Sequence, residues 1–132
     1  MPTVLIVDDS ESVRAAIREL FEAEPEFSVI GEAVNGLDAI GKVEELSPDL
    51  IVLDLSMPIM NGLEAADTLK SRWPDVPIFV HTAHGGPEVE RAARAAGVDA
   101  VFSKGDDMQK LIGSARAAFS SRTHKKRSAK EH

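Results

Sequence analysis

Five polar side chains follow apolar runs of the chain, and their chemical types suit the binding of metal ions and phosphate. Asp8 and Asp9 follow VLIV, Asp54 follows LIVL, and Thr82 and Lys104 end two later runs. In an open parallel sheet the carboxyl ends of the strands share one edge, where sites form. If these runs are strands of such a sheet, three carboxylates, one hydroxyl and one ammonium group surround a single crevice.

Three neighbouring carboxylates repel one another and need a cation or protons to coexist near neutral pH. Mg²⁺ is the natural cation, because it prefers oxygen ligands and keeps positions open for water or phosphate oxygens. An aspartate carboxylate can also act as a nucleophile and form an aspartyl-phosphate. Each residue alone has an ordinary interpretation as a cap, a turn or a surface residue. The combination predicts a Mg²⁺-dependent phosphoryl site.

The elements that must position these residues alternate between apolar runs and helix-period segments, five times along the chain. Continuous apolar runs are typical of strands that are covered on both faces of a parallel sheet. Asn35, Asn61 and Asp106 are predicted N-caps of the helices that follow them. The predicted strands are Val4–Asp8, Phe27–Ala33, Leu50–Asp54, Ile78–Thr82 and Ala100–Ser103.

The repeated strand–helix pattern predicts an α/β domain with right-handed crossovers and a doubly wound parallel sheet. Rossmann-like and flavodoxin-like strand orders both satisfy the periodicity. The length of 132 residues favours the flavodoxin-like (βα)5 order 2-1-3-4-5. In that order the first and third strands are neighbours, which brings Asp8, Asp9 and Asp54 together at the switch point.

Composition limits the class of protein further. Hydrophobic residues make up 43% of the chain and charged residues 28%, the ordinary mix of a globular domain. No apolar run approaches the ~20 residues of a membrane helix, and we expect no secretory signal. The absence of cysteine excludes disulfides and thiolate metal sites and fits a reducing compartment. We therefore expect a cytoplasmic protein with no membrane partner.

The charge is divided between an acidic body and a short basic tail. Residues 122–132 hold five Lys or Arg and one Glu, a formal charge of +4. Residues 1–121 hold 10 basic and 21 acidic residues, a formal charge of −11. Phosphate affinity requires clustered basic residues, so we expect no direct nucleic-acid binding from residues 1–121. The tail has almost no apolar residues to bury, which favours disorder.

Residues 1–121 resemble the receiver domain of two-component response regulators. The matching pieces are VLIVDDS at 4–10, IVLDLSMPIMNG at 51–62, TA at 82–83, and Lys104. The resemblance implies that Asp54 is the phosphoacceptor and that Asp9 is a direct Mg²⁺ ligand. Asp8 would act mainly through a metal-bound water, and the backbone carbonyl of Ser56 would complete the protein ligands.

The resemblance also implies the reaction and the partners. Thr82 would bond a phosphoryl oxygen with help from the backbone N–H of Ala83, and Lys104 would pair with another oxygen. The donor would be a phosphohistidine of a sensor histidine kinase, a phosphotransfer protein or a small phosphodonor. Self-catalysed hydrolysis would reset the domain, which makes it a phosphoprotein switch rather than an enzyme. The output surface would be the fourth helix, fifth strand and fifth helix, about residues 86–121.

The chain departs from the family pattern at two positions. Family members usually have Tyr or Phe three residues before the Lys, where this chain has Val101. Phe102 follows one position late, so we expect it to point to the opposite face of the strand, into the core. Gly105 replaces the Pro that often follows the Lys, as recurs in the NarL-like branch. Ser56, His84 and Val101 are candidate modulators of hydrolysis and of signal transmission.

The function has alternatives from other classes. The chain could be a stand-alone receiver that acts on an output protein, or the receiver of a longer regulator with a C-terminal DNA-binding domain. A haloacid-dehalogenase-type phosphatase also uses an Asp nucleophile, but it needs a second Asp where this chain has Ser56. A flavodoxin-like cofactor binder would need a phosphate-binding loop after the first strand, where this chain has DDS.

Overall fold

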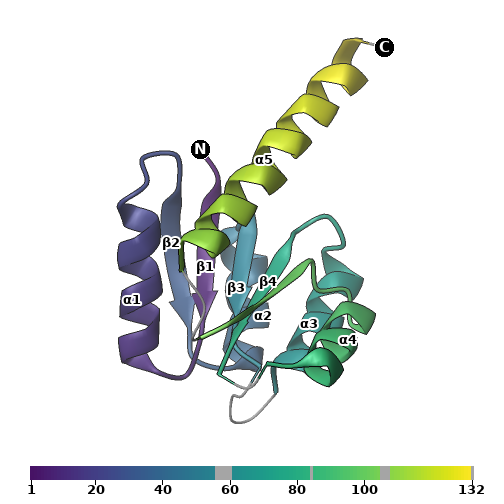
Figure 1. Ribbon diagram of the computed structural model, residues 1–132. Helices are drawn as coiled ribbons and strands as arrows, with labels where there is room; N and C mark the ends of the chain where they lie inside the picture. The colour runs from purple at the N-terminus through teal and green to yellow at the C-terminus, as the bar shows by residue number, and fades with distance from the viewer. Residues whose placement is uncertain (56–60, 84, 105–107, 132) are drawn as a thin grey trace.

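The structure is a computed structural model that describes residues 1–55, 61–83, 85–104 and 108–131, with residues 121–131 described as backbone only. Five strands alternate with five helices along the described chain (Figure 1). The strands are β1 (Thr3–Val7), β2 (Ser28–Ala33), β3 (Leu50–Leu53), β4 (Ile78–Thr82) and β5 (Ala100–Ser103). The helices are α1 (Glu11–Glu22), α2 (Gly36–Leu46), α3 (Gly62–Arg72), α4 (Pro87–Ala95) and α5 (Met108–Glu131).

The strands form one parallel sheet in the order β2-β1-β3-β4-β5. The predicted flavodoxin-like order is therefore confirmed. The predicted bounds of β4 and β5 are correct, whereas β1 and β3 each end one residue earlier than expected. Asp8 and Asp54 thus come immediately after their strands rather than within them.

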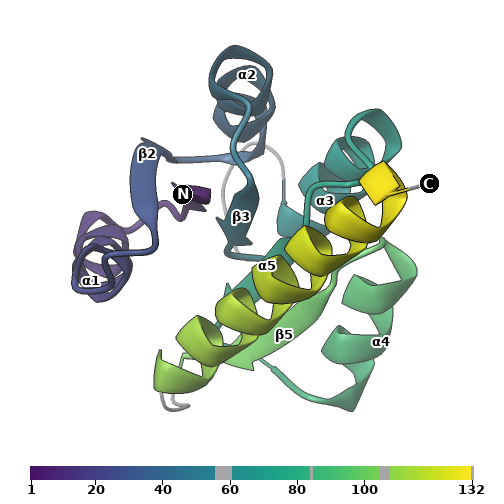
Figure 2. The ribbon, with the colours of Figure 1, turned by 90° about the horizontal axis from the view of Figure 1, so that it is seen from above.

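Two hydrophobic clusters cover the two faces of the sheet. One cluster contains Ile17 and Phe21 of α1 and Leu111 and Ile112 of α5. The other cluster is built on residues of α2, α3 and α4. Alternate residues of β1 supply the two clusters, with Leu5 on one side and Ile6, Val4 on the other. Both faces are buried, which explains why the strands are continuous apolar runs. Figure 2 shows the helices lying to either side of the strands.

Side-chain caps begin the first three helices. The Ser10 hydroxyl accepts a hydrogen bond from the backbone N–H of Val13. Asn35 and Asn61, both predicted caps, accept hydrogen bonds from the third residue after each. Such caps satisfy N–H groups that the first turn leaves without a helical partner. The predicted cap Asp106 lies outside the described residues.

Helix α5 continues past residue 121, the predicted end of the domain. The segment predicted as a tail has no Gly or Pro, and its Lys, Arg, Ala and Glu residues favour helix. The backbone of residues 122–131 extends the helix beyond the sheet (Figure 1). The domain boundary itself stays a prediction. In the described part of the chain, no helix is both long and apolar enough to span a membrane.

Candidate functional site

Three carboxylates come together at the carboxyl edge of the sheet. One oxygen each from Asp8, Asp9 and Asp54 lies within 4.8 Å of the others. β1 and β3 are adjacent, and the backbone N–H of Asp54 donates to the Val7 carbonyl at 2.9 Å. Asp8 is 1% exposed and Asp54 is 3% exposed, whereas Asp9 is exposed to solvent. Two buried carboxylates and one solvent-exposed carboxylate thus form one acidic cluster.

The segments that follow these strands fix the backbone of the site. The Asp8 carboxylate accepts a hydrogen bond from the Ser10 N–H at 2.9 Å. Gly62, at the start of α3, donates its N–H to the Leu55 carbonyl at 3.0 Å. A Cβ at Gly62 would lie only 2.4 Å from the Asp54 carbonyl oxygen. The backbone of α3 can therefore approach the Asp54 segment this closely only because residue 62 is glycine.

Lys104 supplies the positive charge of the site. Its ammonium nitrogen lies 3.1 Å from Asp8 Oδ2 and 3.8 Å from Asp54 Oδ1. The Lys104 backbone N–H donates to the Thr82 carbonyl at 2.8 Å. Parallel pairing of β4 with β5 places Thr82 opposite Ser103, one residue before Lys104. The two strands thereby bring the hydroxyl and the ammonium group to the same edge as the carboxylates.

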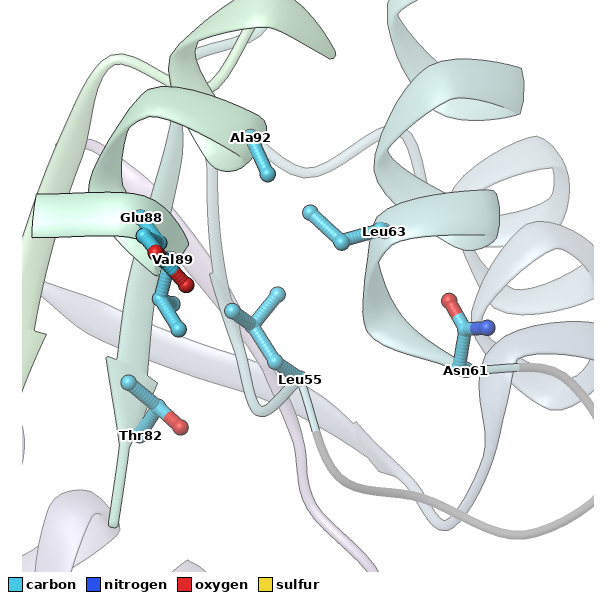
Figure 3. Close-up of a pocket in the computed structure, with 7 residues that line it drawn as sticks. All are labelled: Leu55, Asn61, Leu63, Thr82, Glu88, Val89 and Ala92. Carbon is cyan, nitrogen blue, oxygen red and sulfur yellow. The ribbon is translucent and has the colours of Figure 1, made fainter. Parts of the chain in front are cut away.

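Thr82 is buried and lines a cavity of about 310 Å³ between α3 and α4. Figure 3 shows the Thr82 side chain at the end of β4, with Val89 of α4 above it and Leu55 on the side toward α3. Apolar side chains make up most of the lining, together with Asn61 and Glu88. Thr82 therefore borders a largely apolar space on the side of α4.

Of the remaining predicted site residues, the structure describes Ala83 and Val101. Ala83 is exposed directly after Thr82. Ser56 and His84 lie outside the described residues, as does Gly105. Val101 packs against the cluster on the α3 and α4 side of the sheet, and Phe102 against the cluster on the α1 and α5 side. The Phe102 ring lies 5.7 Å from that of Phe79. The expectation that Phe102 faces the core, on the side opposite Val101, is confirmed.

Sequence reasoning did not single out Arg14 as a site residue, although it contacts the acidic loop. Its guanidinium donates to the backbone carbonyl of Asp8 at 2.8 Å and to the carboxylate of Glu32 at 2.8 Å. Arg18 donates to the other Glu32 oxygen at 2.7 Å. Burial raises the pKa of Glu32, but the hydrogen bonds from Arg18 and Arg14 outweigh it and leave that pKa below the usual 4.5. The sequence feature that could have indicated this role is the position of Arg14, in the first turn of the helix that follows the DDS segment.

The chemistry of the donor set fits Mg²⁺. The ligands that the described residues offer are carboxylate oxygens, and two of the three carboxylates are buried. Such a concentration of negative charge favours a divalent cation with hard oxygen ligands. The site thus combines three carboxylates, one lysine and one hydroxyl at the same edge of the sheet.

The fold and the site define a receiver domain of the two-component type. The sequence matches the response regulator receiver domain over residues 4–116, and the chain belongs to this family. A two-component response regulator of the LuxR family from Aurantimonas sp. SI85-9A1 has a TM-score of 0.87 and 28% identity to the chain. The alignment covers 92% of this chain and 86% of that one.

Similarity to NarL places the chain in the NarL-like branch of the family. The nitrate/nitrite response regulator protein NarL of Escherichia coli (strain K12) is 36% identical over 110 residues, covering 83% of this chain and 51% of NarL. A putative transcriptional regulator of Pseudomonas aeruginosa is 36% identical over 124 residues, covering 94% of this chain and 59% of the relative. The chain thus spans little more than half the length of these relatives.

Proposed function

We propose that this chain is a phosphoacceptor switch in which Asp54 accepts a phosphoryl group in a Mg²⁺-dependent reaction. The observation that carries the proposal is the buried Asp54 carboxylate, 3.8 Å from the Lys104 ammonium group and within 4.8 Å of two further carboxylates. A structural ion pair would need one carboxylate for one lysine. Three clustered carboxylates with one lysine beside two of them leave negative charge, which a further cation is suited to balance.

In the proposed transfer, an Asp54 carboxylate oxygen attacks the phosphorus of a phosphohistidine on a sensor histidine kinase or a phosphotransfer protein. A P–O bond to Asp54 forms, the P–N bond breaks, and the electron pair leaves with the imidazole. With a small phosphodonor such as acetyl phosphate, the P–O bond to the acetyl group would break instead and acetate would leave with the electron pair. Lys104 would pair with one phosphoryl oxygen, and the Thr82 hydroxyl and Ala83 N–H would bond another. Catalysis here is mainly positioning and charge neutralisation.

Asp8, Asp9 and Asp54 would hold Mg²⁺, with the backbone carbonyl of Ser56 as a further ligand. When bound, the ion would neutralise charge on the phosphoryl oxygens as the acceptor and donor exchange the group. Asp8 stays hydrogen-bonded to the Ser10 N–H and paired with Lys104, so its carboxylate is oriented before any ligand arrives. The exposed Asp9 carboxylate is accessible to an incoming hydrated ion.

Helix α4 is the element best suited to respond. Among the described residues of α4, only Ala93 is buried, so few apolar contacts hold it in place. The cavity beside Thr82 separates α4 from α3 and leaves room for movement. A phosphoryl group that draws the Thr82 hydroxyl toward Asp54 would change this cavity. Since Val101 replaces the usual aromatic residue, we propose that α4 transmits the signal through Val89 and its neighbours.

The output is proposed to be a C-terminal DNA-binding domain of a longer transcription regulator, because the relatives are about twice as long as the matched region. A stand-alone receiver that binds an output protein is the second candidate. The acidic charge of residues 1–121 disfavours DNA binding by the receiver itself. The gene sequence beyond residue 132 separates the two candidates.

The test is the intact mass of the protein after incubation with acetyl phosphate. We expect a gain of one phosphoryl group that requires both Mg²⁺ and Asp54, and therefore no gain in Asp54→Asn. The switch is not expected to act on separate substrates. If a phosphate ester were hydrolysed with many turnovers, the chain would instead be a phosphatase of the haloacid-dehalogenase type, which Ser56 already disfavours.

A further inference from the structure

Arg14 connects the acidic loop to the neighbouring strand through two hydrogen bonds. It is the fourth residue of α1, and its side chain is only 13% exposed. Nη1 donates to the Asp8 carbonyl oxygen at 2.8 Å, and Nε donates to Glu32 Oε1 at 2.8 Å. Glu32 belongs to β2, which pairs with β1, so the guanidinium spans from the loop after β1 to the strand beside it.

The orientation of the Asp8 carbonyl group affects the position of two carboxylates of the site. This carbonyl belongs to the peptide group that joins Asp8 to Asp9, and this group is planar. Its orientation therefore sets the directions in which the two carboxylates leave the backbone. The other polar groups of Asp8 are also held: its N–H donates to the Ala33 carbonyl, and its carboxylate is bound by the Ser10 N–H and Lys104.

The position of Arg14 is itself fixed by the strand beside it. Glu32 binds Arg14 and Arg18 with its two carboxylate oxygens, and Lys42 donates to the Glu32 backbone carbonyl at 2.6 Å. Glu32 is thus anchored at both its carboxylate and its backbone. An arginine can bridge a carboxylate and a carbonyl at once because its donors form a rigid fork.

We infer that Arg14 is a positioning residue that holds the Asp8–Asp9 peptide in the orientation that binds Mg²⁺. The inference rests on the proposed function, since it assigns the two aspartates to a cation site. The inference predicts that loss of Arg14 lowers the affinity for Mg²⁺, which is opposite to the change that electrostatics alone would cause. Removing a positive charge near an acidic site should strengthen cation binding, whereas loss of positioning should weaken it.

Arg18 provides the matched control. It is an arginine of the same helix and binds the same Glu32 carboxylate, but its second bond goes to Glu22. Arg14→Met and Arg18→Met each remove one guanidinium and one bond to Glu32. Only the first removes the bond to the Asp8 carbonyl. A role limited to folding would affect the two variants alike.

The experiment is titration calorimetry of the full chain with MgCl₂ alone, paired with thermal unfolding in the absence of the ion. We expect Arg14→Met to weaken Mg²⁺ binding about tenfold, the low end of what loss of a residue behind a metal ligand costs. Arg18→Met should change the affinity less than twofold while it lowers the unfolding temperature comparably. Arg14→Lys, which keeps the charge but cannot bridge both oxygens, should weaken binding at least threefold.

Unchanged or tighter Mg²⁺ binding in Arg14→Met and Arg14→Lys would overturn the inference, as would an equal loss in Arg18→Met. If Arg14→Met fails to fold, Arg14→Lys decides by the same criterion. Failure of the wild-type chain to bind Mg²⁺ would overturn the proposed cation site itself. That result is distinct, because it appears before any variant is compared.

Discussion

Lys104 is the residue on which the charge balance of the site depends. Its ammonium group lies between the Asp8 and Asp54 carboxylates, at 3.1 and 3.8 Å. Its positive charge offsets part of the repulsion between these two buried carboxylates. In the proposed reaction, the same ammonium group would pair with a phosphoryl oxygen once Asp54 is phosphorylated. One side chain would thus serve both the free and the phosphorylated states.

Lys104→Met should therefore change two properties in opposite directions. Mg²⁺ affinity should rise about fivefold, since removal of one unit charge a few ångströms away is worth on the order of 1 kcal/mol. Phosphorylation by acetyl phosphate at saturating Mg²⁺ should slow about 100-fold, because a preorganised charge on the reacting group is lost. Calorimetry and the rate of mass gain measure the two effects. Lys110→Met, at an exposed lysine of α5, is the control, and equal rates in both variants would contradict this role.

The start of α3 is placed against the Asp54 segment by a glycine. A Cβ at position 62 would lie 2.4 Å from both the Asp54 carbonyl oxygen and the Leu55 Cα. These are backbone atoms, so Gly62→Ala must displace α3 or the segment that carries Asp54. We expect the free energy of unfolding to fall by about 2 kcal/mol, as in overpacked cores.

Gly41→Ala is the control for that substitution. Gly41 lies within α2, and a Cβ there would meet nothing within 4 Å. Alanine favours helix over glycine by up to ~1 kcal/mol, so this variant should be more stable than the wild type. Urea unfolding of both variants measures the difference. Equal stability of the two would show that α3 does not require the close approach.

The contact between α1 and β2 should be pH-dependent through Glu32. Burial raises the pKa of Glu32, but the hydrogen bonds from Arg18 and Arg14 lower it by more, so that the net pKa is below 4.5. A carboxyl group with a depressed folded-state pKa contributes stability above its unfolded pKa and loses it as pH falls through the folded value. The stability difference between wild type and Glu32→Gln should thus be full above about pH 5 and shrink below about pH 4.5.

Urea unfolding without Mg²⁺, at several pH values from 7 to 3, measures this difference. Glu19→Gln, at an exposed glutamate of α1, should differ little from the wild type throughout. A difference for Glu32→Gln that stayed constant or grew on acidification would mean that Glu32 does not act through its two arginine partners.

At the scale of the whole molecule, the strands and the residues at their ends could be predicted, because they depend on local patterns. The strand order could be predicted from the length of the chain, since the periodicity alone fits two orders. Continuous apolar runs identify buried parallel strands, and parallel order then brings Asp8, Asp54 and Lys104 to one edge. The side chains of Val101 and Phe102 could be predicted to lie on opposite faces of the sheet, because side chains alternate with a two-residue period along a strand.

Other features could not be predicted, because they depend on side-chain reach across the fold. The bridge from Arg14 to the Asp8 carbonyl requires the angle at which α1 lies on β1 and β2. The cavity beside Thr82 depends on how α3 and α4 sit beside each other, since residues of both helices line it. The continuation of α5 past residue 121 has no apolar pattern that would indicate it, since a polar basic segment can form helix through its backbone propensity alone.

The most direct test of the whole account is the chemical identity of the acceptor. After incubation with acetyl phosphate and Mg²⁺, borohydride reduction of an aspartyl-phosphate converts that aspartate to homoserine, which peptide mass spectrometry can locate. We predict homoserine at Asp54, in the peptide that contains LDLSMP, and at no other carboxylate. Homoserine at Asp8 or Asp9 would contradict the account, and so would a phosphoryl gain that resists borohydride.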